Sequence, residues 1–270
     1  MAGTQDFQGK WALVTGASAG IGVELARELA ASGAKLILTA RRRERLEGLA
    51  AELGAKGTET RIVVADLNDA AAPQAIYDAT EGAGITVDIL VNNAGLGQYG
   101  SFLTSEVEQE LGQVRVNCEA VVRLARLFVP RMVERRRGWM LVVASTASFQ
   151  PVPYLATYAA TKVFDRFFAL GVAAEVARFG VKVTALCPGS TESEFFEIAH
   201  AQKFKINVQA TNAVARQAID ALARGKRTIL PSWNGKATAL LSRLVPVGLI
   251  TRVVERAARP EKRGTKGLRD

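Results

Sequence analysis

Histidine and cysteine are scarce in this chain of 270 residues, which has one histidine, His200, and two cysteines, Cys118 and Cys187. A metal site built from several histidines is therefore excluded, and His200 is expected in a loop or at the surface. Two cysteines form no disulfide framework and have no metal-ligand spacing. The sequence thus predicts no metal site and indicates a reducing compartment.

Long apolar segments are also missing. No apolar run reaches the ~18 residues that a membrane-spanning helix needs. The first eight residues, Met1 to Gln8, lack the basic segment and apolar core of a signal peptide. We therefore expect a cytoplasmic protein. No Pro/Gly/Ser-rich linker, repeat or low-complexity tract divides the chain, so one domain is expected, and an apolar content of 49% is ample for its core.

Acidic residues are outnumbered, and the formal net charge is +9. Much of the excess lies in Arg41–Arg43, in Arg135–Arg137 and in the tail from Arg252 to Arg269. Charge of this sign would suit a nucleic acid, but no recognised binding motif accompanies it. Nucleic-acid binding is therefore not predicted.

Apolar β-rich segments alternate with helical ones along the chain. Strands are expected near residues 11–15, 35–39, 61–65, 87–91, 139–144, 181–186 and 227–230, and helices near 20–32, 42–53, 69–82, 105–133, 155–179 and 211–224. Nearly continuous apolar segments such as Leu141-Val142-Val143 are typical of parallel strands buried on both faces. The alternation predicts an α/β fold with a doubly wound parallel sheet and helices on both faces.

A glycine-rich turn follows the first expected strand and opens the first expected helix. Gly16 would permit a tight turn, Gly20 a close approach of the backbone to a pyrophosphate, and Gly22 close packing of helix on strand. The phosphates would meet free N–H groups at the helix N-terminus. The spacing GxxxGxG differs from the usual GxGxxG, and alone it would also suit an ordinary glycine-rich loop.

Tyr158 and Lys162 are four residues apart on an expected helix, so their side chains share a face. A neighbouring ammonium favours the phenolate and lowers the pKa of a tyrosine, which makes it useful for proton transfer. Ser145 stands 13 residues before the tyrosine. Taken alone, the YxxxK spacing is more typical of an amphipathic helix with one lysine that extends to solvent.

Together these motifs resemble the short-chain dehydrogenase/reductase family. The resemblance rests on the segment from Thr15 to Gly22, on Asn92-Asn93-Ala94-Gly95, on Asn117, Ser145, Tyr158 and Lys162, and on Pro188-Gly189. It extends from about residue 9 to about residue 235. It implies a Rossmann-like sheet of seven parallel strands in a catalytic domain at 1–235, with 236–270 as a C-terminal extension of the same domain.

The resemblance implies a hydride transfer between a nicotinamide and a carbonyl or secondary alcohol. Tyr158 would be the general acid/base, and Lys162 would lower its pKa and bind the nicotinamide ribose. Ser145 would polarise the substrate oxygen, and Asn117 would hold a proton-relay water. A non-catalytic NADP(H)-sensing protein on the same fold, and an isomerase or dehydratase that recycles its cofactor, are the alternatives.

The expected cofactor is NADP(H), with NAD(H) as the less favoured alternative. The second strand ends without Asp or Glu, and Arg41 and then Arg42 would meet a 2′-phosphate. Ser193 stands where the family usually has threonine, and Ser148 replaces a frequent glycine. The full set of cofactor residues implied is Gly16, Ser18, Ala19, Gly20, Ile21, Gly22, Arg41, Arg42, Asp66, Leu67, Asn92, Ala94, Gly95, Tyr158, Lys162, Pro188, Gly189, Thr191 and Ser193.

An apolar ketone, aldehyde or alcohol is the expected substrate. Its candidate pocket residues are Leu96, Phe149, Val152, Tyr154, Phe195, Phe196 and Ile198.

Beyond Pro231, amphipathic helices are expected at 236–245 and 247–258, and 260–270 is expected to be disordered. These basic helices would cover the pocket, pack at a subunit interface or lie on an anionic membrane surface. A homodimer or homotetramer is expected from the family resemblance.

Overall fold

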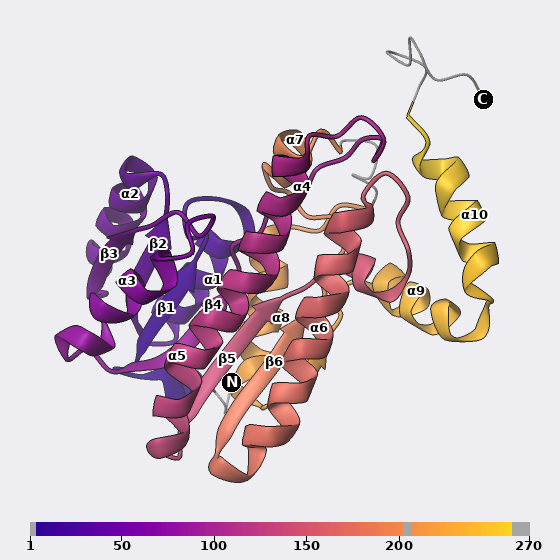
Figure 1. Cartoon of the computed structure of the whole chain (residues 1–270). Helices are drawn as coiled ribbons and strands as arrows, with labels where there is room; N and C mark the ends of the chain where they lie inside the picture. Colours follow the sequence, from indigo (N-terminus) through magenta and orange to yellow (C-terminus); the bar gives the residue numbers. More distant parts are fainter. Residues whose placement is uncertain (1–3, 202–206, 261–270) are drawn as a thin grey trace.

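The computed structural model describes residues 4–201 and 207–260. Its centre is one sheet of seven parallel strands in the order β3-β2-β1-β4-β5-β6-β7 (Figure 1). This confirms the predicted doubly wound sheet. The strands are β1 (Trp11–Thr15), β2 (Lys35–Ala40), β3 (Thr60–Val64), β4 (Val87–Asn92), β5 (Gly138–Val143), β6 (Val181–Leu186) and β7 (Thr228–Ile229).

Helices cover both faces of the sheet (Figure 1). The longer ones are α1 (Gly20–Ala31), α2 (Arg43–Gly54), α3 (Ala72–Asp78), α4 (Val107–Val114), α5 (Ala120–Glu134), α6 (Ala156–Val176), α8 (Thr211–Ala223), α9 (Trp233–Leu244) and α10 (Val247–Ala258). Short helical turns are η1 (Thr4–Phe7), η2 (Glu81–Ala83), η3 (Arg115–Glu119), η4 (Thr146–Phe149), η5 (Ala177–Phe179) and α7 (Phe195–Ile198).

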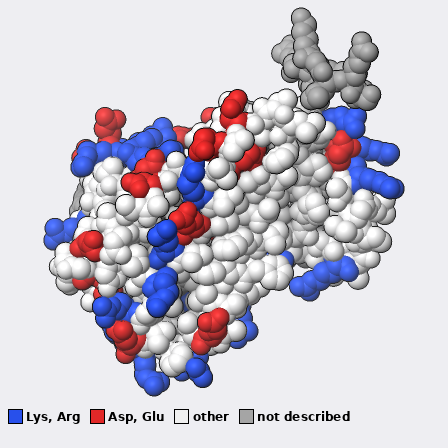
Figure 2. All heavy atoms as spheres, viewed as in Figure 1, with Lys and Arg blue, Asp and Glu red and all other residues white. Residues whose placement is uncertain are grey.

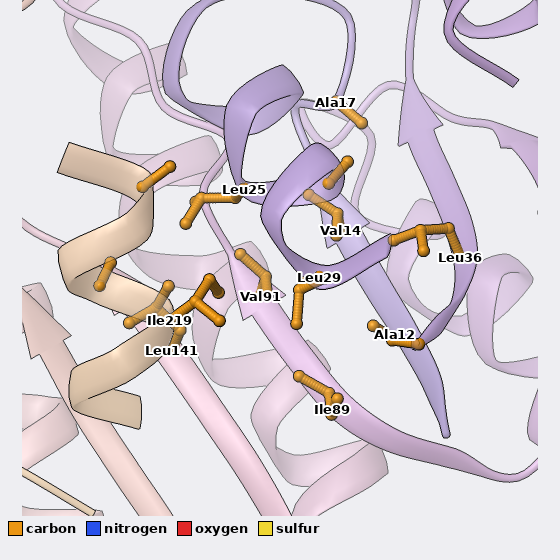
Figure 3. Close-up of a cluster of buried hydrophobic side chains, with 14 of the residues drawn as sticks. Ala12, Val14, Ala17, Leu25, Leu29, Leu36, Ile89, Val91, Leu141 and Ile219 are labelled. Carbon is orange, nitrogen blue, oxygen red and sulfur yellow. The ribbon is translucent and has the colours of Figure 1, made fainter. Parts of the chain in front are cut away.

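The central strands β1, β4 and β5 are nearly all apolar because they bury both faces, whereas the edge strand β3 is partly exposed. In β1, Ala12 and Val14 join a core shared with α1 and α8, whereas Leu13 joins a second core shared with α5 and α6. Figure 3 shows the first core, where Leu25 and Leu29 of α1 and Ile219 of α8 meet the strands. The period of two along each strand therefore divides the interior into two apolar layers.

The longest helix expected from the sequence, at 105–133, is interrupted in the structure. It consists of α4, the π-helical turn η3 (Arg115–Glu119) and α5. A π turn accommodates one extra residue per turn and commonly marks a functional site. Here it contains Asn117, whose side chain is fully buried. A pattern of apolar residues does not reveal such a wide turn, because the periodicity continues on both sides.

The helix expected at 69–82 is shorter in the structure, where α3 covers Ala72–Asp78. The Thr80 hydroxyl donates hydrogen bonds to the Ile76 and Tyr77 carbonyls, which ends the helix. The other elements begin and end within a few residues of the predicted bounds.

Helices α9 and α10 confirm the two helices expected after Pro231. Helix α9 begins at Trp233 rather than 236 because the Ser232 side chain caps it, accepting from the Gly235 N–H at 2.9 Å. Pro246 separates the two helices. The tail expected to be disordered lies, from residue 261 onward, outside the described residues.

Candidate active site

The glycine turn after β1 is built around backbone that only glycine adopts readily. Gly16 and Gly20 have φ of 67° and 57°. A Cβ at Gly16 would come within 2.8 Å of Asn93, and one at Gly22 would lie 2.3 Å from the Gly16 carbonyl oxygen. Gly22 therefore packs α1 against the turn, as expected, and its place is behind the loop rather than at the surface of the site.

Helix α1 begins at Gly20 directly after this turn, and no side chain caps it. Its first N–H groups are therefore available to an anion, and the helix dipole favours negative charge there. A Cβ at Gly20 would lie 2.9 Å from the Ser193 Cβ, so the loop after β6 closes over this helix end. These features fit the diphosphate of a dinucleotide.

Two arginines follow β2 at the same edge. Arg42 donates to the Ser18 hydroxyl at 3.2 Å and to Glu194 at 3.0 Å, and Arg41 is exposed. Hydrogen bonds from Arg45, and next from Arg42, hold the pKa of Glu194 below its usual value. Arg42 therefore connects the glycine turn to the loop after β6.

Tyr158 and Lys162 lie on one face of α6. The Lys162 Nζ donates to the Val143 carbonyl at 2.7 Å and to Asp165 Oδ2 at 2.9 Å. It lies 5.9 Å from the centre of the Tyr158 ring. The lysine is thus held at the end of β5, beside the tyrosine.

The pKa of Tyr158 lies above its ordinary value because burial disfavours the phenolate. The Lys162 charge and a hydrogen bond with Ser145 act in the opposite direction and lower it. The sequence predicted this effect of the lysine but not that burial outweighs it. Burial also lowers the pKa of Lys162, but the charges of Asp165 and Tyr158 more than offset this, so the lysine remains an ammonium.

Ser145 follows β5 in extended conformation and begins the short helix η4. Its hydroxyl accepts from the Ala147 N–H at 3.1 Å, which orients it at the carboxyl end of the sheet. Ser148 donates to the Ser145 carbonyl at 2.6 Å. The serine that replaces a frequent glycine therefore reinforces this turn.

Asn117 is buried behind the tyrosine and lysine. Its Nδ2 donates to the Leu96 carbonyl and to Thr161, at 2.9 and 2.8 Å, and its Oδ1 accepts from the Leu96 N–H at 2.8 Å. A Cβ at Gly95 would lie 3.4 Å from Lys162 Nζ and 3.5 Å from Asn117 Oδ1, so both groups flank one point. The π turn thus places the amide near the lysine, on the same side of Gly95.

A cavity of about 610 Å³ joins most of these groups at the carboxyl edge of the sheet. Of the residues implied by the sequence, those that line it are Gly16, Ser18, Ala19, Gly20, Ile21, Arg41, Arg42, Asp66, Leu67, Ala94, Gly95, Ser145, Tyr158, Lys162, Pro188, Gly189, Thr191 and Ser193. Gly22, Asn92 and Asn117 are not part of its wall.

The sequence predicted Asn92 as a cofactor residue, but in the structure its neighbour Asn93 lines the cavity instead. Asn93 lines the cavity and donates to the Thr15 carbonyl at 2.8 Å. Asn92, the last residue of β4, is buried, and neither polar atom of its side chain has a hydrogen-bond partner among the described residues. Alternation along the strand accounts for this, because neighbouring residues point to opposite sides.

The other end of the cavity is apolar. Leu96, Val152, Phe195 and Ile198 line it as expected, whereas Phe149 and Tyr154 do not. Phe149 packs under Arg166, 4.0 Å from its ring centre, and the Tyr154 hydroxyl donates to Glu255 on α10. The side chain of Phe196 lies outside the described residues.

The C-terminal helices complete this apolar end. Thr238 of α9 and Val253, Val254 and Ala257 of α10 line the cavity. Tyr99 donates to the Ala258 carbonyl at 2.8 Å and fastens the end of α10 to the rim. Of the alternatives that the sequence left open for this segment, covering the pocket is therefore observed.

Sequence reasoning missed two groups of residues. The wall residues of α9 and α10 were recognised as apolar but could not be assigned to the pocket without the tertiary structure. Asp165 carried a signal, since it stands three residues after Lys162, between the apolar pairs Val163-Phe164 and Phe167-Phe168. Nothing in the sequence pointed to Thr161, whose hydroxyl accepts a hydrogen bond from Asn117.

No described helix is long and apolar enough to cross a membrane.

A glycine turn before a helix, beside a serine, tyrosine and lysine at the end of a parallel sheet, defines a dinucleotide-dependent oxidoreductase fold. The chain belongs to the short chain dehydrogenase family, whose model matches residues 10–203.

Relatives place the chain within this family. A very-long-chain 3-oxoacyl-CoA reductase of Anas platyrhynchos is 34% identical over 187 residues, which are 67% of this chain and 59% of that protein. This chain therefore spans little more than half the length of that relative. Among solved structures, a short-chain dehydrogenase from Sphingobium yanoikuyae in complex with NADPH has a TM-score of 0.79 at 29% identity, with 96% and 99% of the two chains covered. One from Burkholderia phymatum in complex with NAD has a TM-score of 0.83 at 25% identity, covering 91% and 96%.

Proposed function

We propose that this protein is an NADP(H)-dependent oxidoreductase that interconverts an apolar carbonyl compound and its secondary alcohol. One observation carries the proposal: Ser145, Tyr158 and Lys162 line the same cavity as the glycine turn before α1. Groups that transfer a proton and backbone that suits a diphosphate thus share one space. A sensor of the cofactor would not require the proton-transfer groups.

Each side chain has a distinct task in this proposal. Tyr158 gives its proton to the substrate oxygen during reduction, and Ser145 donates a hydrogen bond to the same oxygen. Such a donor is worth about 3 kcal/mol in the transition state. When bound, the nicotinamide supplies the hydride. Lys162 holds the nicotinamide ribose, and its charge acts on Tyr158.

Asn117 serves the same proton path. Its Oδ1 accepts one hydrogen bond from Leu96 and has a second lone pair for a water beside Lys162. The common approach of both groups to Gly95 supports this position for the water. Asn117 would thus connect the lysine to solvent.

The preference for NADP(H) rests on the positive charge at the end of β2. Arg41, Arg42 and Ser18 all line the cavity, and a guanidinium matches a 2′-phosphate geometrically. The NADPH complex of the Sphingobium relative supports this choice, and the NAD complex of the Burkholderia relative makes NAD(H) the alternative to test.

The substrate is proposed to be an elongated apolar ketone. The wall formed by Leu96, Val152, Phe195, Val253 and Val254 has no charged group to bind a polar tail. The relatives described as very-long-chain 3-oxoacyl-CoA reductases support an acyl-chain ketone within this class.

The direct test is consumption of NADPH and of NADH with a panel of aliphatic, acyl-chain, steroid-like and aromatic ketones. Turnover with NADPH and a preference for elongated apolar ketones are expected. Preference for NADH would contradict the role of Arg41 and Arg42. NADPH binding without turnover of any ketone would favour the cofactor-sensing alternative instead.

A homo-oligomer, either a dimer or a tetramer, is part of the proposal. The middle of the face formed by α4, α5 and α6 carries few charged side chains in Figure 2, viewed as in Figure 1, whereas charged side chains line its α5 side. Exposed apolar side chains on it are Val107, Leu111, Val114, Val122, Val163, Phe164 and Phe167. A contiguous apolar face of this kind suits a second copy of the chain.

We also propose that α9 and α10 lie on an anionic membrane surface of a cytoplasmic protein. Trp233, Leu240, Leu241 and Leu244 form one exposed apolar row on α9. Five exposed basic residues accompany it on the two helices and at their end: Lys236, Arg243, Arg252, Arg256 and Arg259. Figure 2 shows basic side chains gathered where α10 lies in Figure 1. This charge favours lipid phosphates over a second copy with the same charge.

A further inference from the structure

Asp165 is a buried acid beside the catalytic lysine that the proposed mechanism does not yet use. Its Oδ2 lies 2.9 Å from Lys162 Nζ, and the side chains of the lysine and the aspartate are 5% and 1% exposed. It stands on the face of α6 that carries Tyr158 and Lys162, at positions i, i+4 and i+7. A buried carboxylate of this kind persists only when a cation meets it.

The lysine provides this compensation. Asp165 Oδ1 has no hydrogen-bond partner among the described residues, so Lys162 is the group that holds the carboxylate. An ammonium has three N–H donors. Val143 and Asp165 engage two of them, which fixes the lysine and leaves one for Tyr158 or a ribose hydroxyl.

The other titratable groups that the structure describes around this pair are two cysteines and an arginine. Burial raises the pKa of Cys118, on η3, to about 12 and that of Cys187, after β6, to about 11, so both remain neutral thiols. Arg166, on the same helix, packs on the Phe149 ring and interacts with Cys187. The charges that act on Tyr158 are Lys162, which favours the phenolate, and Asp165, which opposes it.

We propose that Asp165 is a positioning residue that holds the Lys162 ammonium beside Tyr158 and offsets part of its charge, so that Tyr158 keeps its proton. The inference rests on the proposed function, in which the Tyr158 phenol is the proton donor for carbonyl reduction. Asp165 thereby extends to higher pH the range in which the enzyme is ready to reduce a ketone.

The test is the pH dependence of kcat/KM for Asp165→Asn, with NADPH and the best ketone of the panel, and with NADP⁺ and the matching alcohol. Reduction requires the phenol and falls as pH rises through the Tyr158 pKa. Oxidation requires the phenolate and falls as pH drops. Without the Asp165 charge, the Lys162 ammonium acts on Tyr158 unopposed, so both limbs are expected to move to lower pH.

Further variants make the test specific. Asp165→Glu keeps the charge and should return both limbs toward the wild-type pH. Glu175→Gln removes an exposed acid from the same helix and should leave both limbs in place. Ultraviolet titration of the phenolate, with Tyr158→Phe subtracting the other tyrosines, measures the same shift without turnover. NADPH binding confirms that each variant folds, and Asp165→Ser replaces Asp165→Asn if the latter does not.

A uniform loss of turnover with both limbs unmoved would overturn the inference and leave Asp165 a purely structural ion pair. Failure of the proposed function has a different signature, because the wild type would then bind NADPH without turning over any ketone, or Tyr158→Phe would retain turnover.

Discussion

The Tyr158 hydroxyl is the proton donor in the proposed reaction. Its removal should therefore lower the turnover rate without weakening NADPH binding. Tyr158→Phe is expected to lower kcat by about 10³-fold, the usual scale of general acid catalysis. NADPH affinity should change little, because the ring and its packing at 5.1 Å from the Phe195 ring remain. Steady-state kinetics and fluorescence titration with NADPH give the two values.

Tyr77→Phe is the matched control, because the Tyr77 hydroxyl accepts from Arg131 at the surface of α5, away from the cavity. Turnover of this variant should match the wild type. If Tyr158→Phe remained competent, the proton would have to come from another group.

Arg41 and Arg42 decide between the two nicotinamide cofactors in the proposed function. The double variant Arg41→Gln/Arg42→Gln should raise the KM for NADPH about 10- to 100-fold, because a hydrogen bond to a charged group contributes roughly 1.5–3 kcal/mol. The KM for NADH, which has no 2′-phosphate, should change little.

Arg43→Gln is the control, since Arg43 pairs with Glu47 on the exposed side of α2. An equal loss with both cofactors would indicate that the two arginines support the glycine turn through Ser18 rather than bind the 2′-phosphate.

Among the helical elements, the π turn η3 places the Asn117 side chain in the interior of the protein. Asn117→Ala would leave the Leu96 N–H and carbonyl and the Thr161 hydroxyl without their partner. The expected loss is about 2–3 kcal/mol in the free energy of unfolding, measured in urea. Asn234→Ala, at an exposed position of α9, should change it by less than about 0.5 kcal/mol.

The sequence predicted the helices and strands well, but not the π turn that interrupts the helix expected at 105–133. Strands such as β4 and β5 are nearly all apolar, and a short continuous apolar segment of this kind is enough to predict a strand that is buried on both faces. The glycine turn, Ser145, Tyr158 and Lys162 were recognisable because their spacing along the chain is short and their chemistry is distinctive. Asn117 was recognisable from the family resemblance, but its π turn was not, because the apolar periodicity continues on both sides of it. The pairing of Asp165 with Lys162 had a local signal in its i,i+3 spacing, but the burial of both side chains depends on packing of α6 against its neighbours.

The proposed membrane contact of α9 and α10 can be tested with lipid vesicles. Leu240→Ser/Leu244→Ser should weaken binding to vesicles of phosphatidylcholine with phosphatidylglycerol about 10²- to 10⁴-fold, since each of the two buried leucines contributes roughly 1.5–3 kcal/mol. Binding of the wild type should fall as salt is raised. Sedimentation with the vesicles measures both effects.

Phe102→Ser/Leu103→Ser is the control, because these residues are equally exposed but lie before α4. Equal binding of the wild type to vesicles of phosphatidylcholine alone would argue against the basic residues, and no sedimentation at all would refute the membrane contact.

At the scale of the whole molecule, we propose that the apolar side chains on the face of α4, α5 and α6 mediate assembly. Phe164→Asp/Phe167→Asp should reduce the molar mass in solution to that of one chain, 28.9 kDa, because it places two charges in the apolar face. Light scattering after size-exclusion chromatography measures this. Trp233→Asp, an equally drastic change on α9, should leave the mass unchanged, and a loss of assembly there instead would place the interface on the C-terminal helices.

The wall of the cavity comes from two separate stretches of the chain. Every group proposed to bind the cofactor or transfer the proton precedes residue 203, where the match to the family model ends, whereas α9 and α10 supply a lid of apolar side chains after it. Tyr99 and Tyr154 fasten that lid to the body. The lid is therefore an exchangeable part: grafting the corresponding segment of another family member behind Pro231 would alter which ketones fit while the hydride and proton machinery stayed intact.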